Sequence, residues 1–200
     1  MIAAPEAVLD FWFGAPGSAN EIAERQRTLW FGKSAANDQL VLDRFAATLV
    51  AAGKSELDSW ALSPRTLLAL IVVLDQFPHH IHRNHGQSFA YDAQSLALTL
   101  SMIQRGEDVH VAPIERVFAY LPLEHAESMA MQDLSVAQYE KLAAEASPAE
   151  QGLFEGFLDY ARKHREVVAR FGRFPHRNEL LGRPSTPEEI EFLKQPGSRF

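Results

Sequence analysis

The feature that most constrains the fold is the run 67–74, in which all eight residues are aliphatic. Its length and composition fit either a buried strand or a buried helix. No second strand-like run occurs in the chain, so a strand here would have no partner to pair with. The run follows Ser63–Pro64, and proline is favoured in the first turn of a helix. We therefore predict a central buried helix in an all-α fold.

Helix start and stop signals recur along the rest of the chain. Ser18–Glu21 and Thr186–Glu189 have the pattern of capping boxes, in which side chains satisfy free backbone N–H groups. With apolar residues at helical spacing, these signals predict helices over residues 5–13, 18–30, 38–53, 92–105, 113–121, 123–132, from 135 onward, 147–171 and from 186 onward.

About nine helices with short connections make a single-domain array of antiparallel pairs over residues 1–200, with a short tail from about 195. Such pairs invite comparison with the helical hairpins of tetratricopeptide repeats, which recur about every 34 residues. The chain has no repeated sequence signature, so the comparison concerns architecture alone.

Composition narrows the class of protein. No apolar run approaches the roughly 18 residues of a membrane span, and the N-terminus lacks the pattern of a secretion signal. Absence of cysteine excludes disulfides, thiolate metal sites and cysteine nucleophiles. We therefore expect a cytoplasmic protein with no membrane partner and no cofactor.

Charge is distributed unevenly. The net charge of −7 argues against a general nucleic-acid binder. Between residues 162 and 183 there are seven basic residues and two acidic ones, so this segment carries +5 and the remainder −12. Such asymmetry indicates internal ion pairs with the acidic body, an anion site, or both.

Within that basic segment, residues 171–183 mix arginine, histidine and asparagine with aromatic rings, glycine and proline. The rings of Phe171 and Phe174 must be buried somewhere. We therefore expect a loop that is docked on the body, with its polar groups held at fixed positions.

Four segments carry a resemblance to a known family. They are VLDFWFG at 8–14, LDQFP at 74–78 with Ile81 and Arg83, FAYLPLEHAE at 118–127, and FGRFPHRN at 171–178 with Leu181–Gly182–Arg183. With them the chain resembles the bacterial domain-of-unknown-function 924 family over nearly its whole length. The resemblance implies an all-helical fold similar to tetratricopeptide-repeat proteins, and it implies no agreed activity.

Two positions depart from the pattern of that family. Residue 79 is His where the family pattern has Arg, and residue 126 is Ala where it has Ser. If position 79 contributes to anion binding, binding in this chain is expected to be weaker or to depend on pH.

Glu124, His125 and Glu127 form one candidate constellation. Functionally, His125 would be a general base or a ligand oriented by a neighbouring carboxylate. Alternatively, Glu124 and Glu127 pair with arginines of the 171–183 loop and hold it in place; both roles are compatible.

Asp75 and Gln76 end the most apolar helix. A carboxylate there needs a partner, and Arg173 or Arg177 could grip it with two parallel hydrogen bonds. The alternative role for Asp75 is an acid/base group with a shifted pKa.

Four histidines crowd residues 79–85. Pairs of them could face one way on a helical turn, but zinc sites usually need three or four protein ligands. We expect a solvated histidine-rich turn and no metal site. His164 has the spacing of an inward-facing residue on the longest helix, where a hydrogen-bonded core histidine is the simpler interpretation.

The loop itself allows three interpretations. Arg173, His176, Arg177 and Arg183, with Asn178 as a neutral donor, could converge on a phosphate or carboxylate. The same mixture of aromatic residues and arginine could bind a protein partner. Finally, the arginines could satisfy helix ends and the acidic residues named above.

Together these features favour a polar pocket that binds a small anionic molecule, with acid/base chemistry as an option. The candidate catalytic residues are Asp75, His125 and His176, and the candidate ligand-binding residues are Gln76, Glu124, Glu127, His164, Arg173, Arg177, Asn178 and Arg183. The alternative is a tetratricopeptide-like module that binds a protein partner and uses the arginine-rich loop structurally.

Overall fold

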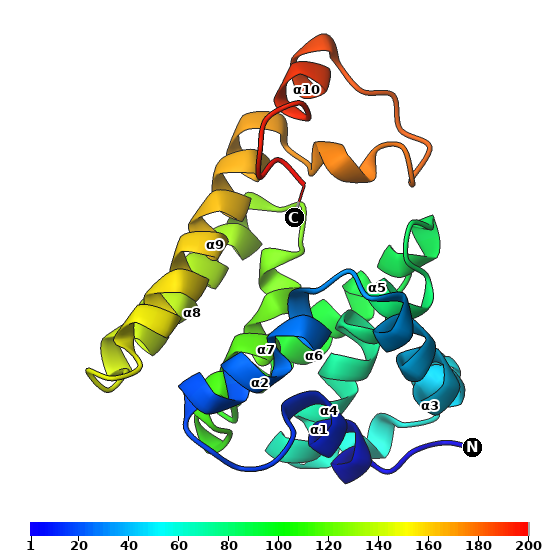
Figure 1. Ribbon diagram of the computed structural model, residues 1–200, viewed down its shortest axis with the longest axis vertical. Coiled ribbons are helices and arrows are strands. Elements are labelled where there is room, and N and C mark those ends of the chain that lie inside the picture. The colour runs from blue at the N-terminus through cyan, green and yellow to red at the C-terminus, as the bar shows by residue number, and fades with distance from the viewer. Residues whose placement is uncertain (200) are drawn as a thin grey trace.

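Residues 1–199 form ten α-helices and four short 3₁₀ helices (η), and the α-helices are labelled in Figure 1. The structure is a computed structural model that describes residues 1–199, and those residues contain no strand, which confirms the all-α prediction. The α-helices are α1 Pro5–Phe13, α2 Ala19–Phe31, α3 Ala35–Gly53, α4 Pro64–Asp75, α5 Phe77–Ile81, α6 Asp92–Gln104, α7 Pro113–Glu124, α8 Met129–Glu145, α9 Gln151–Phe171 and α10 Pro187–Phe192. The 3₁₀ helices are η1 Asp58–Leu62, η2 Gly86–Phe89, η3 Asp108–His110 and η4 Pro175–Arg177.

Helix α4 is the centre of the body. Every residue from Leu67 to Leu74 is buried, and α4 packs against α1, α3, α6 and α7. Aromatic rings complete this core, with Trp12 lying 5.8 Å from Phe77 and 5.5 Å from Phe118 between ring centroids. The predicted central helix is therefore confirmed, because burial on all sides explains why its sequence is apolar on all sides.

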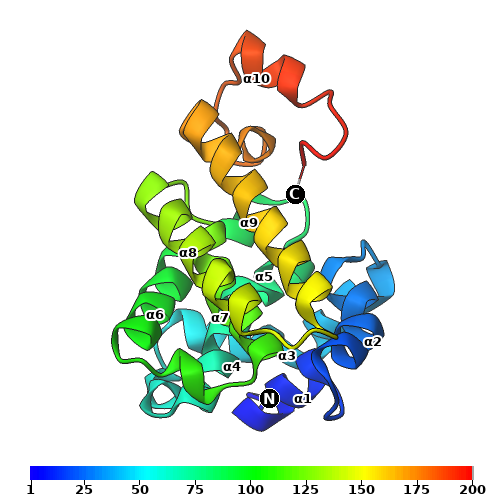
Figure 2. The same cartoon turned by 90° about the vertical axis from the view of Figure 1, so that its left-hand side faces the viewer.

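Helices α8 and α9 run side by side as a long hairpin, and α10 lies beyond the end of α9 (Figures 1 and 2). A second, smaller apolar cluster forms there, in which Phe174 packs with Val167 and Val168 of α9 and with Met129, Phe171 and Phe192. Phe174 is completely buried. The loop after α9 is thus docked, as the two Phe rings predicted.

The predicted helix break at Pro122 is wrong. Helix α7 continues through Pro122 to Glu124, and the break falls at residues 125–128. Packing against α4 and α8 outweighs the one backbone hydrogen bond that proline removes. Gln132 helps to end α7, because its Nε2 donates to the carbonyl oxygens of Glu124 at 2.7 Å and Ala126 at 2.8 Å.

Other boundaries also differ from the prediction. Helix α8 is continuous, so Ser135 lies buried in its middle and does not cap a helix. Helix α3 begins at Ala35 with Ser34 as its cap, not at Asp38. Helix α5 was not predicted. The predicted tail from about 195 begins within turns that follow α10 at 193–197, and its residue 200 lies outside the described residues. Within residues 1–199, no helix has both the length and the apolar character that crossing a membrane requires.

Candidate functional site

The ends of α4 and α7 bring Asp75 and His125 together. Asp75 is the last residue of α4, and His125 is the C-cap of α7. Nδ1 of His125 lies 2.9 Å from Oδ1 of Asp75, and Nε2 of Gln76 donates to Oδ2 at 2.6 Å. The Asp75 side chain is fully buried, while His125 keeps 17% of its side chain exposed. The carboxylate therefore fixes a histidine that solvent reaches.

Charge coupling stabilises the ionised forms of this pair. Burial alone would raise the pKa of Asp75, but the charge and hydrogen bond of His125 hold that pKa below its ordinary value. Burial alone would lower the pKa of His125, but Asp75 raises it above its ordinary value. The C-terminal end of α7 also favours a cation at this position. His125 is thus oriented as a proton donor beside a buried carboxylate.

Neither arginine that we expected beside Asp75 is its hydrogen-bond partner. Arg177 instead donates from Nη1 to Oδ2 of Asp92 at 3.2 Å, and Arg173 pairs with Glu189. The expectation failed because α7 ends three residues later than its sequence signals indicated, and this extra length carries His125 to Asp75.

Two phenyl rings cover the guanidinium group of Arg177. Its Cζ lies 4.6 Å from the ring centroid of Phe89 in η2 and 4.6 Å from that of Phe174. The Arg177 side chain is 7% exposed, and its Nε is buried without a hydrogen-bond partner. Burial lowers the pKa of Arg177, and Asp92 opposes that shift. Arg177 remains a cation with unused donor capacity.

His79 lies next to His125 and to Phe89. Its ring centroid is 5.6 Å from that of Phe89, which also contacts Arg177, and 5.5 Å from that of His125. Burial and the charge of His125 lower the pKa of His79 to about 3, and its Nε2 is buried without a partner. His80 is buried and the whole His79 residue is half-buried, so the predicted solvated turn is wrong for His80 and holds only in part for His79. Within residues 1–199, no cluster of three histidine, aspartate or glutamate side chains is arranged to hold a metal ion.

Glu124 and His164 form a second buried pair. Nδ1 of His164 lies 3.1 Å from Oε1 of Glu124 and 2.9 Å from the carbonyl oxygen of Tyr160. Burial raises the pKa of Glu124 to about 8 and lowers that of His164 to about 3. Both groups are therefore uncharged near neutral pH, and the contact is one between neutral polar groups. His164 faces inward, as its spacing predicted.

Glu127 anchors the loop. It accepts hydrogen bonds from Nη1 and Nη2 of Arg183 at 2.6 and 2.8 Å and from the backbone N–H of Phe174 at 2.8 Å. Asn178 accepts from Nε of Arg183 at 3.1 Å. Of the two carboxylates expected to bind loop arginines, Glu127 does so and Glu124 does not.

Arg173 and His176 complete the loop. Arg173 donates to both carboxylate oxygens of Glu189 in α10, at 2.6 and 2.8 Å, and Nδ2 of Asn178 reaches the same carboxylate at 3.3 Å. The ring of His176 lies 5.7 Å from that of Phe174, and burial together with Arg177 lowers the pKa of His176 to about 4. These contacts engage Arg173, Arg183 and Asn178 within the fold.

A model of bacterial proteins of unknown function, DUF924, matches residues 8–197 of the chain. The chain belongs to the DUF924 family. A solved structure of a protein of unknown function from Agrobacterium tumefaciens, ATU0120, is similar to it with 35% sequence identity and a TM-score of 0.80. That similarity covers 95% of this chain and 96% of the other. Among curated proteins, none has a significantly similar sequence.

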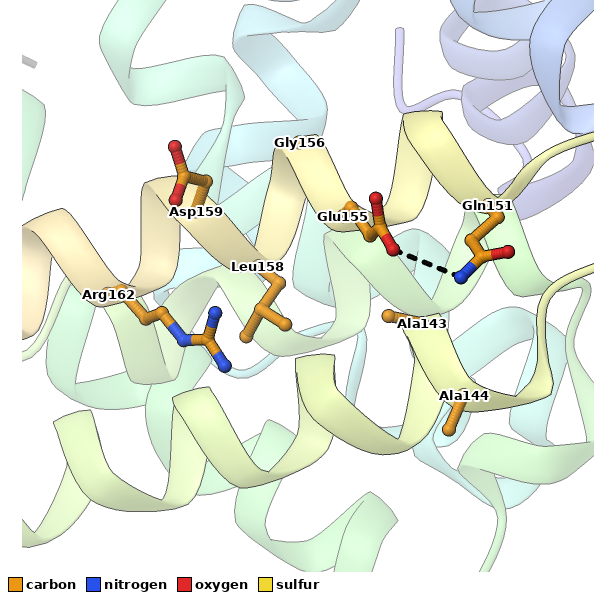
Figure 3. A pocket seen from close by; sticks show the side chains of 8 residues that line it. All are labelled: Ala143, Ala144, Gln151, Glu155, Gly156, Leu158, Asp159 and Arg162. Carbon is orange, nitrogen blue, oxygen red and sulfur yellow. Dashed lines mark hydrogen bonds between the residues drawn. The ribbon is translucent and has the colours of Figure 1, made fainter.

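This DUF924 chain also has two cavities away from the cluster around His125. The larger, about 670 Å³, lies between α8 and α9 and is lined by Ala143, Ala144, Gln151, Glu155, Gly156, Leu158, Asp159 and Arg162 (Figure 3). The smaller, about 230 Å³, is lined by Ile103, Asp108, Val109, Arg116, Tyr120, Gln138, Lys141, Leu142 and Glu145. None of the predicted site residues lines either cavity.

We still place the candidate site of this DUF924 chain around His125. The open cavity between α8 and α9 has both acidic and basic side chains, and its Arg162 is paired with Glu140. Among residues 1–199 it thus has no buried polar side-chain atom without a hydrogen-bond partner, whereas the cluster around His125 has two, Nε of Arg177 and Nε2 of His79. Sequence reasoning missed Asp92 and Phe89 as members of this cluster. Asp92 was visible as an acidic helix start, but nothing in the sequence linked it to Arg177.

Proposed function

We propose that this protein binds a small anionic molecule between Arg177 and His125. The observation that carries the proposal is a buried arginine, Arg177, whose Nε has no hydrogen-bond partner among residues 1–199. The ring of Phe89 contacts both Arg177 and His79, and His79 contacts His125, which a buried aspartate orients. Buried donors are nearly always satisfied in folded proteins, so an unused one suggests a ligand. The charge of Arg177 acts on the pKa values of His79 and His125, which supports a common site.

In this proposal the chemistry is proton donation to the bound ligand. Within residues 1–199, His125 makes its hydrogen bond through Nδ1, which leaves Nε2 for the ligand. Asp75 keeps the ring protonated and oriented, and Gln76 keeps the carboxylate oriented. His176 is neutral near pH 7, so His125 is the better proton donor of the two. Arg173, Arg183 and Asn178 support the site by holding the loop.

A thermal-shift screen with small carboxylates and phosphates tests the proposal. A ligand at a hundred times its dissociation constant adds about 2.7 kcal/mol, which is a few degrees for a chain of this size. We expect at least one anion to raise Tm in the wild type and in Arg162→Gln, a matched control at an exposed arginine. The same anion should have no effect on Arg177→Lys. A full shift in Arg177→Lys, or no shift with any anion, would refute the proposal.

A second candidate function is a module that binds a protein partner. The cavity between α8 and α9 favours it, and Tyr160 on α9 is exposed. If the protein has this function, the wild type should retain a purified partner in a pull-down. Tyr160→Ala should fail to retain that partner, and His125→Asn should retain it as well as the wild type does. A pull-down that recovers nothing above background counts against it.

A further inference from the structure

Arg177 limits which anion the proposed site can take. A guanidinium group has five N–H donors in one plane, arranged as a fork that matches two oxygens of an anion. Among residues 1–199, Arg177 makes its hydrogen bond through Nη1, to Asp92. Nε has no partner, and no hydrogen bond engages Nη2. The edge formed by Nε and Nη2 therefore keeps two unused donors, which match a ligand that presents two oxygens side by side.

The two rings on Arg177 restrict the direction of approach. Phe89 and Phe174 both lie 4.6 Å from Cζ, so the ligand must approach along the edge of the guanidinium group, in its plane. A carboxylate is planar, and both of its oxygens fit that plane. A phosphate or sulfate is tetrahedral, and its remaining oxygens would project towards the apolar rings, where no donor replaces their hydration.

Charge balance also favours a singly charged ligand. Asp75 compensates His125, and Asp92 compensates Arg177. Glu124, His79 and His164 are neutral near pH 7. Among these described groups the charges cancel, so a dianion would leave twice the uncompensated charge that a monoanion leaves, and the cost of removing an ion from water grows steeply with its charge.

The contact with Asp92 shows that Arg177 already donates a hydrogen bond to one carboxylate oxygen. At 3.2 Å, it is longer than the 2.7–2.9 Å that is usual for charge-assisted hydrogen bonds. Asp92 therefore engages only part of the hydrogen-bonding capacity of Arg177. A second carboxylate can bind Arg177 without displacing Asp92.

We infer that the site takes a small monocarboxylate, whose two oxygens accept hydrogen bonds from Nε and Nη2 of Arg177 in the plane between Phe89 and Phe174. This inference rests on the proposed function and narrows it to one class of ligand. Nε2 of His125 then donates its proton to another part of the same ligand.

NMR titration of the full chain with acetate and propionate, and with inorganic phosphate at matched ionic strength, tests the inference. The signals observed are the side-chain Nε–H of Arg177, assigned from the spectrum of Arg177→Lys, and the ring of His125. We expect both carboxylates to shift the Arg177 signal in a saturable way and phosphate to leave it unchanged. Arg177→Lys should weaken acetate binding at least about tenfold, because a lysine ammonium has no planar fork.

Asp92→Asn provides a second variant in case Arg177→Lys fails to fold. Removing the competing negative charge should tighten acetate binding about fivefold or more. Saturation by phosphate as tight as that by acetate, or weaker acetate binding in Asp92→Asn, would overturn the inference and leave an anion site in place. If no anion shifts either signal, the proposed function fails together with the inference.

Discussion

Asp75 and His125 lie 50 residues apart in the chain, yet Oδ1 of one is 2.9 Å from Nδ1 of the other. The contact joins the end of the central helix α4 to the end of α7. It joins a buried carboxylate to an accessible histidine, and each of the two residues shifts the pKa of the other. The predictions below follow from this relationship and from the loop that covers it.

Replacing Asp75 should move the pKa of His125 downwards. Asp75 raises the pKa of His125, whereas burial lowers it. In Asp75→Asn the raising effect is lost and the lowering effect of burial remains. The wild-type pair stabilises the fold above the pKa of Asp75, and this contribution is lost as the pH rises through the raised pKa of His125. An NMR titration of the His125 ring in the wild type and in Asp75→Asn measures the effect. An unchanged His125 titration would show that the aspartate does not control the ring.

Glu124 should make the folded protein less stable as the pH rises towards 8. Its carboxyl group has a pKa of about 8 in the folded protein, above its ordinary value of 4.5, so the folded chain holds a proton that the unfolded chain releases. Stability therefore falls as the pH rises from about 4.5 to 8. Glu124→Gln is neutral at every pH and should gain on the order of 4 kcal/mol relative to the wild type between pH 5 and pH 8.

Urea unfolding at both pH values measures this gain, and Glu140→Gln on the exposed face of α8 controls for the loss of a carboxylate. Parallel pH profiles for wild type and Glu124→Gln would mean that Glu124 is ionised in the folded protein.

Gly86 should be essential for docking the loop. A Cβ at this position would lie 2.6 Å from the carbonyl oxygen of Leu180, which is backbone and cannot rotate away. Gly86→Ala should cost about 1–3 kcal/mol and should increase amide exchange in residues 178–183.

Gly156→Ala is the matched control for that substitution. Among residues 1–199, no atom other than the local backbone of α9 lies within 4 Å of a Cβ at Gly156, so alanine should stabilise the helix by about 0.5–1 kcal/mol. Equal effects of the two substitutions on denaturant midpoints would rule out the close contact between η2 and the loop.

The Glu127–Arg183 pair should contribute more than an exposed ion pair. Both side chains are 25% exposed and share two hydrogen bonds, whereas Arg162 and Glu140 are about half exposed. Double-mutant cycles should give a coupling of about 1.5–3 kcal/mol for Glu127–Arg183 and under about 1 kcal/mol for Arg162–Glu140. Similar couplings for the two pairs would contradict the anchoring role of Glu127.

Sequence patterns predicted the all-α class, the central helix and the docked loop, because each depends on local spacing or on the burial of large rings. They failed at Pro122, where packing of α7 overrode a local break. Sequence patterns also failed to predict which basic residue pairs with which carboxylate. Which arginine meets which carboxylate depends on where helices end in space, and an error of one turn in α7 was enough to assign Asp75 to the wrong partner.

The arginine-rich loop illustrates the same limit. Its composition indicated an anion site, and two of its three most promising arginines are held in bidentate pairs with Glu127 and Glu189. Arg177 differs from them partly through Phe89 and Asp92, two residues that the sequence did not connect to the loop.

A crystal structure of the protein grown in the presence of a carboxylate that raises its Tm is the most direct test of the central claim. We predict the carboxylate on the Nε–Nη2 edge of Arg177, with Nε2 of His125 within hydrogen-bond distance of the same molecule. A carboxylate seated in the cavity between α8 and α9, with the edge of Arg177 still unoccupied, would contradict the account.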